Sequence, residues 1–192
     1  MVWHEGPDFT RLLDLATTTP AEVARMLTAG VGAGDDVAAL SFAALADEGL
    51  APEGAEALLR TALPTATGTF LVRVAQALHA LTGDESWATP IASVLTSQAF
   101  WGVRIDAALA LGAFAPTPEL IELLGQGVCD ADYLVRYHSA NALLRYAGRA
   151  KKDLYDYPTL FDKIAGETTK TYRAKRREVA DQLTKEALHR LG

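Results

Sequence analysis

The chain has 192 residues, of which 49% are hydrophobic, with one cysteine, Cys129, and a formal net charge of −6. This length suits a single domain that buries a continuous core, and one cysteine excludes an internal disulfide. The first residues contain no apolar signal-peptide core, and no apolar run reaches the roughly 18 residues of a membrane-spanning helix, so we predict a cytoplasmic protein.

Hydrophobic periodicity divides the chain into about eleven short helices and predicts an all-α fold. Apolar residues recur at spacings of three and four, and the abundant Ala and Leu residues favour helix. Connections of two to six residues fit antiparallel neighbours. The predicted helices span residues 8–16, 20–29, 36–48, 52–62, 69–82, 86–96, 101–113, 117–126, 132–147, 157–165 and 171–190.

Individual residues predict several helix ends. Thr19, followed by Pro20 and Glu22, is typical of a capping box with proline in the first turn. Thr117 and Asp132 are expected to be N-caps, because their side-chain oxygens can accept hydrogen bonds from first-turn N–H groups. The glycines expected in left-handed stops after helices are Gly83, Gly112 and Gly148.

Three predicted helices share one residue pattern. Residues 103–111 read Val-Arg-x-x-Ala-Ala-x-Ala-Leu, residues 135–143 match them closely, and residues 72–81 form a looser copy. The Val-Arg pairs start 31 and 32 residues apart, and a second short helix follows each copy. Residues 36–45 look like a degenerate earlier copy. A period near 30 residues with two helices per unit indicates an α-solenoid.

This pattern resembles HEAT repeats, in the short bacterial form close to the phycobilisome-lyase type. The resemblance covers about residues 36–165 and implies a right-handed α-solenoid of stacked antiparallel helix pairs, in one domain spanning residues 1–192. Residues 1–35 would form N-terminal cap helices, and residues 166–192 a C-terminal capping helix. The Val-Arg helices would form one wall. The other, usually concave, wall would consist of the helices at 52–62, 86–96, 117–126 and 157–165.

The repeat arginines Arg73, Arg104 and Arg136 stand at one register of the pattern. They could form a ladder that binds anions, or they could satisfy carbonyls and acids such as Asp106 and Asp132 between repeats. Repeats of this family carry the arginine whatever their task, so we predict a structural role.

The sequence contains no recognisable catalytic, metal or cofactor site, and we predict none. No two histidines have the helical spacing of a metal-binding pair. The dipeptide His4-Glu5 occurs once, whereas the HEAT-like di-iron hydroxylases use several such dipeptides. Cys129 and His138 have no evident third group to orient them, so we expect Cys129 to be a small buried thiol.

The predicted concave wall carries side chains that could bind a partner. Its acidic residues favour a basic helix or loop, and a solvated helix face is the alternative interpretation. Among the aromatic residues, we expect Trp101 in the core and Trp87, Tyr155 and Tyr157 nearer the surface. The candidate binding residues are Glu53, Glu56, Arg60, Trp87, Glu119, Glu122, Gln126 and Tyr157.

The charge is unevenly distributed. Residues 170–192 hold seven basic and three acidic residues, which gives +4, whereas residues 1–169 hold 11 basic and 21 acidic residues, which gives −10. An acidic body repels phosphate backbones and attracts basic proteins. The apolar stripe of the last helix suggests that this helix caps the last repeat. Its basic residues could instead form a contact surface for nucleic acid or an acidic partner. The stripe consists of Val179, Leu183, Ala187 and Leu191.

Three function hypotheses follow. The leading one is a protein-binding HEAT-repeat scaffold or adaptor, such as an immunity-type inhibitor or an assembly factor, whose partner is basic or offers an apolar helix. The second is a HEAT-like DNA-binding protein or alkylbase DNA glycosylase, which the basic last helix, Trp87 and Trp101 favour and the acidic body disfavours. A lyase-type HEAT protein is the third.

Overall fold

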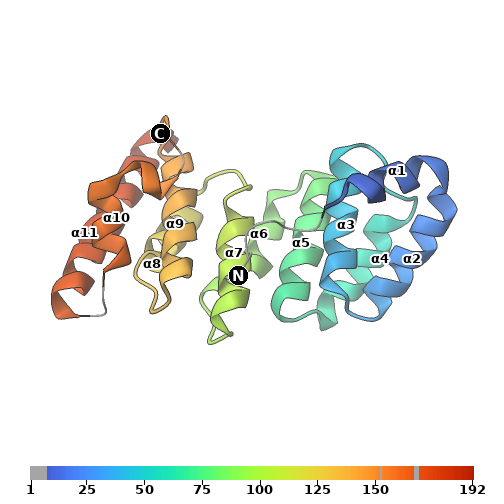
Figure 1. Ribbon diagram of the computed structural model, residues 1–192, viewed down its shortest axis with the longest axis horizontal. Coiled ribbons are helices and arrows are strands. Elements are labelled where there is room, and N and C mark those ends of the chain that lie inside the picture. Colours follow the sequence, from blue (N-terminus) through green and yellow to red (C-terminus); the bar gives the residue numbers. More distant parts are fainter. Residues whose placement is uncertain (1–7, 152, 167–168) are drawn as a thin grey trace. The chain divides into compact units, whose positions relative to one another are not determined.

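The computed structural model describes residues 8–151, 153–166 and 169–192 (Figure 1). In these ranges the chain forms eleven α-helices and three short 3₁₀-helices and contains no strand. The predicted all-α class is therefore confirmed. The chain divides into two compact units, residues 1–90 and 91–192, and helix α6 (Ala88–Leu95) crosses their boundary. We describe each unit by itself.

The helices of the N-terminal unit form two layers. α3 and α5 pack against each other, while α2 packs on both α3 and α4 (Figure 1). The largest fully buried side chains in this unit are Phe42, Leu45, Leu59 and Leu78, and burying each one stabilises the fold by about 1.5–3 kcal/mol. The elements are α1 (Thr10–Thr18), α2 (Pro20–Gly32), α3 (Asp36–Asp47), α4 (Ala55–Ala62), η1 (Leu63–Thr65), α5 (Gly68–Thr82) and η2 (Glu85–Trp87).

In the C-terminal unit, α9 is the central helix. It packs on α7, α8, α10 and α11, and nine of its residues are buried, including Val135 and Leu143. The elements are α7 (Trp101–Leu111), α8 (Pro118–Gly127), α9 (Tyr133–Tyr146), η3 (Leu154–Asp156), α10 (Pro158–Ala165) and α11 (Lys170–Leu191).

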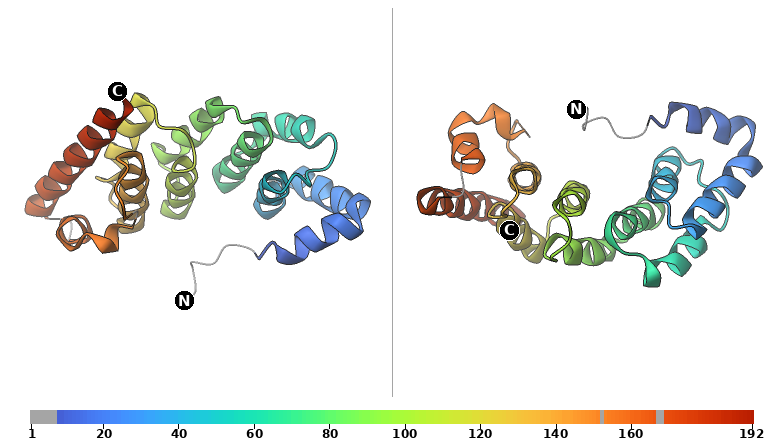
Figure 2. Two further views of the ribbon diagram at one scale, coloured as in Figure 1. Left: turned by 90° about the horizontal axis from the view of Figure 1, so that it is seen from above. Right: turned by 60° about the horizontal axis from the view of Figure 1, so that its bottom comes forward.

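Helix α8 packs against the last helix, α11. Helix α8 packs chiefly on α9 and α11, and α10 packs on α9, η3 and α11. That residues 117–126 and 157–165 share one wall stays a prediction. Both views of Figure 2 show α11 running beside α8. The apolar stripe of α11 explains the arrangement, because three of its four residues are buried while Leu191 is 42% exposed. The buried three are Val179, Leu183 and Ala187.

Most helix ends follow the local prediction. Asp132 Oδ1 accepts hydrogen bonds from the N–H groups of Leu134 and Val135, at 2.8 and 3.3 Å, and Thr117 Oγ1 accepts one from Leu120 at 3.2 Å. Both predicted caps are confirmed. Gly83 and Gly148 have φ values of 67° and 66°, as expected of left-handed stops.

Two local predictions are wrong. Thr19 makes no capping bond to α2. Its hydroxyl donates to the Leu15 carbonyl instead, because Thr19 is the only residue between α1 and α2 and completes the last turn of α1. Gly112 has φ −64° and is not left-handed. Its lack of a side chain leaves room for the Arg145 guanidinium, which a Cβ would overlap.

Candidate functional site

Four of the predicted binding residues lie at one end of the N-terminal unit. Arg60 Nε donates to Glu56 Oε1 at 2.8 Å, one turn apart on α4. The Arg60 guanidinium carbon lies 4.9 Å from the centroid of the Trp87 ring, in cation–π geometry. Glu53 is exposed in the turn that leads into α4. The structure therefore brings Arg60 into contact with Trp87, 27 positions later in the sequence.

A cavity of about 440 Å³ adjoins this cluster, and we call it the α4 groove. Small and apolar side chains form most of its lining, and the Glu56–Arg60 pair supplies its charged edge. The lining residues are Ala51, Pro52, Gly54, Ala55, Glu56, Ala57, Arg60 and Leu81.

Local hydrogen bonds hold Trp87 in place beside the groove. Its indole Nε1 donates to Thr82 Oγ1 at 3.1 Å, and the short helix that carries it is capped by Asp84, which accepts the Ser86 N–H at 2.9 Å. Trp87 also packs against the buried core of the unit, so it is half-buried rather than fully exposed. Its position is thus fixed without a partner.

The charged residues around the groove are mostly acidic. The Ser86 backbone N–H and hydroxyl hold the pKa of Asp84 below its ordinary value, and the charges of Arg60 and His79 act in the same direction. Glu85 Oε1 lies 3.3 Å from His79 Nε2. The site can therefore attract cations, and the only fixed cation among these residues is Arg60, already engaged with Glu56.

The other predicted binding residues belong to the C-terminal unit. Glu119, Glu122 and Gln126 form an exposed row on α8. The backbone N–H of Glu119, followed by the hydroxyl of Thr117, lowers the pKa of Glu119. Tyr157 stands apart from this row at the start of α10, where its hydroxyl donates to the Lys151 carbonyl at 2.9 Å.

Two of the three repeat arginines bind internal acceptors of the C-terminal unit. Arg104 donates to both carboxylate oxygens of Asp130, at 2.9 and 3.1 Å. Arg136, which is 3% exposed, donates to the carbonyls of Ala131, Ile164 and Asp130, at 2.8, 3.0 and 3.1 Å.

Burial, and then the charge of Arg176, lowers the pKa of Arg136. The third repeat arginine, Arg73, lies in the N-terminal unit and donates to Gln76 at 2.8 Å. All three guanidinium groups therefore have acceptors within their own unit.

Sequence reasoning missed an aromatic cluster in the C-terminal unit. The rings of Tyr155 and Phe161 lie 4.7 Å apart, Tyr137 lies 5.3 Å from Tyr155, and Tyr133 lies 6.4 Å from Phe161. Three separate elements contribute these rings, so no single-helix periodicity could reveal the cluster. Tyr155 is 62% exposed, in line with the expectation that it lies near the surface.

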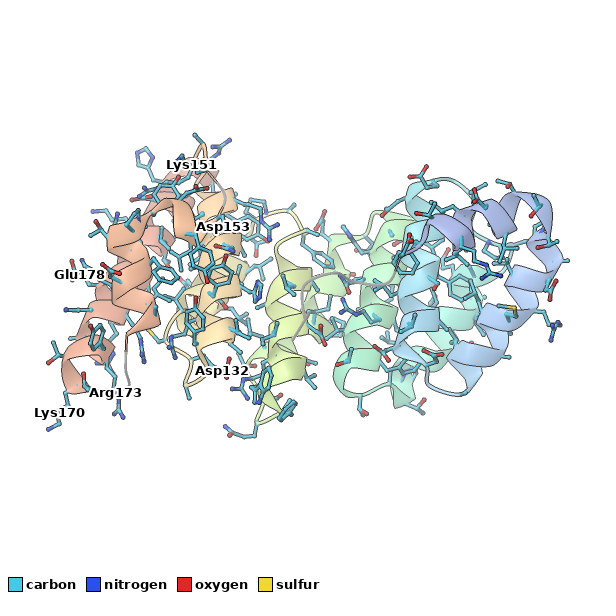
Figure 3. All side chains as sticks on the ribbon, viewed as in Figure 1. Asp132, Lys151, Asp153, Lys170, Arg173 and Glu178 are labelled. Atoms are coloured by element: carbon cyan, nitrogen blue, oxygen red, sulfur yellow. The ribbon has the colours of Figure 1, made fainter. Side chains whose placement is uncertain are left out.

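A carboxylate orients this cluster from one side. The Tyr137 hydroxyl donates to Asp153, at 2.8 and 2.9 Å from its two oxygens, and Asp153 is labelled in Figure 3. Burial, together with this carboxylate, raises the pKa of Tyr137 to about 12.

Two expected core residues are exposed. Trp101 is the first residue of α7 and is 36% exposed, and its ring lies 4.8 Å from that of its exposed neighbour Phe100. Cys129 is exposed in the turn after α8. Partial desolvation raises the pKa of its thiol, which is therefore protonated at neutral pH. His4-Glu5 lies outside the described residues.

The described residues contain no group of three or more His, Cys, Asp or Glu side chains that could hold a metal ion. Within the same residues, no helix combines the length and the apolar character needed to span a membrane. Comparisons with family models, curated proteins and solved structures find no match to this chain.

Proposed function

We propose that the protein is a HEAT-like adaptor that binds a second protein through the α4 groove. The observation that carries this proposal is the convergence of Glu56, Arg60 and Trp87 beside a cavity of about 440 Å³. Tryptophan and arginine are among the residue types most enriched at binding hot spots, which favour well-packed pockets. The repeat pattern adds support, because stacked helix pairs offer extended binding surfaces.

The groove is also preorganised. Arg60 is held by Glu56 and by the Trp87 ring, and Trp87 is held by Thr82. Ordering a free side chain at an interface costs about 0.5–1.5 kcal/mol, and side chains that are already ordered avoid this cost. A partner would therefore meet a surface that is ready to bind.

Site-directed cross-linking tests the proposal. A photo-reactive amino acid is placed at Glu53, and a control at Ala174, which is exposed on α11. After irradiation in cells of the source organism, we expect one protein adduct from position 53 that is lost when Ala57→Phe fills the groove. The same adduct from position 174, or no adduct from position 53, would contradict the proposal.

A nucleic-acid function is the alternative, and helix α11 is the observation that favours it. Its exposed residues include Lys170, Arg173 and Arg177, and Figure 3 labels the first two. Glu178 and Asp181 interrupt this charge. A DNA mobility shift at low salt that is abolished by Arg173→Glu with Arg177→Glu would favour this alternative, because phosphate contacts dominate such binding.

A further inference from the structure

We infer that the α4 groove takes a basic segment of the partner, in which the stem of a lysine or arginine lies along the groove and its cationic head meets the carboxylates at the edge. This inference rests on the adaptor function proposed above and names the partner's chemistry. It follows from the groove lining, the charges around it and the composition of the N-terminal unit.

The groove lining suits an aliphatic stem. Ala51, Pro52 and Leu81 supply apolar surface, and Ala57 is an exposed methyl group on α4. Gly54, with φ 77°, adds no side chain. Lysine and arginine side chains bury their methylene stems on such surfaces while their charged heads stay in water. A purely polar ligand would leave this apolar lining unused.

The charges at the edge suit a cationic head. Glu53 stands between two lining residues, Glu56 lines the groove itself, and Asp84 and Glu85 follow shortly after Leu81. These four carboxylates are accompanied by one guanidinium, Arg60, so the formal charge of the group is −3 with His79 neutral. Potentials of opposite sign on two surfaces steer association and set specificity.

The whole N-terminal unit reinforces this local field. Residues 1–90 contain 12 acidic residues, four arginines and no lysine, which gives a net charge of −8. An acidic partner would be repelled by this unit before it reached the groove. A basic segment would be attracted, and most strongly at low ionic strength, because salt screens charges at the surface.

Peptide binding tests the inference on the full chain. The probe is a short fluorescein-labelled peptide of alternating lysine and leucine pairs, and the dissociation constant is measured by fluorescence anisotropy at low and high salt. A matched peptide carries acetyl-lysine, which keeps the stem and removes the charge, and another replaces leucine with serine. We expect each matched peptide to bind about tenfold more weakly than the lysine–leucine peptide.

Variants locate the binding site. Glu53→Lys with Glu85→Lys reverses two edge charges, and Glu119→Lys with Glu122→Lys makes the same net change on α8. We expect the first pair to weaken binding about tenfold and the second pair to change it less than about twofold. Ala57→Phe should abolish binding while the melting temperature stays unchanged, because Ala57 is exposed.

Three results would overturn the inference: equal binding of the acetylated peptide, equal losses in the two charge-reversal pairs, or full binding by Ala57→Phe. The cross-linking experiment separates this failure from that of the proposed function. A cross-linked adduct from position 53 without peptide binding would support the adaptor function and show that the partner segment is not basic. Peptide binding in the groove without any cross-linked adduct would support the preference of the groove for a basic segment and contradict the adaptor function.

Discussion

Arg149 and Glu186 form two hydrogen bonds, at 2.8 and 2.9 Å, that join the segment after α9 to helix α11. Both side chains are partly exposed, and the Arg149 guanidinium also lies 5.1 Å from the centroid of the Tyr157 ring. The bidentate geometry makes this pair more specific than a single-contact ion pair. It therefore links the end of α9 to α11 within the C-terminal unit.

Arg149→Ala should lower the free energy of unfolding by about 1 kcal/mol, because it removes this pair and the ring contact. Urea denaturation followed by circular dichroism measures the change. Lys151→Ala is the control, since its ion pair with Asp156 spans 3.6 Å and Lys151 is 62% exposed. Equal losses in the two variants would show that the Arg149–Glu186 geometry adds nothing.

Arg136→Met should destabilise the protein far more, by about 3 kcal/mol. It removes the donor that satisfies three carbonyl groups at a nearly fully buried site, and each unsatisfied buried polar group costs about 1–3 kcal/mol. Arg173→Met, at an exposed position on α11, should change stability by less than about 0.5 kcal/mol. Similar unfolding curves for both variants would argue against a structural role for Arg136.

The raised pKa of Tyr137 predicts a loss of stability at high pH. The phenol keeps its proton in the folded protein to about pH 12, whereas in the unfolded chain it ionises near pH 10. The contribution of this phenol to the free energy of unfolding is thus fully present below pH 10 and is lost between pH 10 and 12. Unfolding free energies should fall more steeply in that window for the wild type than for Tyr137→Phe. Parallel slopes would refute the assignment.

Gly125 and Gly32 should respond oppositely to alanine. A Cβ at Gly125 would lie 2.5 Å from Thr184 Oγ1 on α11, so Gly125→Ala should destabilise by about 1–3 kcal/mol. Thr184→Ala in the same chain should recover most of that loss. A Cβ at Gly32 meets nothing within 4 Å, and Gly32→Ala should stabilise by about 0.4–1 kcal/mol. Melting temperatures give both signs, and a stable Gly125→Ala variant would disprove the tight α8–α11 contact.

Four of the eight predicted binding residues belong to the candidate site, but the sequence did not predict that these four lie together. Glu56, Arg60 and Trp87 were named as separate points on a presumed wall, and their mutual contacts depend on how α4 meets η2. The exposed row of α8 could be predicted from the sequence, because the exposed face of a single helix follows the helical period. The row consists of Glu119, Glu122 and Gln126. Tyr157 was assigned to the same presumed wall and lies at the start of α10.

Helix number, most helix bounds and the caps at Thr117 and Asp132 could be determined from the sequence by itself. Each depends on interactions within about four residues, between a side chain and the backbone nearby. Only the tertiary structure decided that α11 lies beside α8, that Arg104 binds Asp130, and that Trp101 is exposed. Those outcomes depend on which apolar stripes and charges meet across distant segments, and the total packing free energy selects among many arrangements that share the same local pattern.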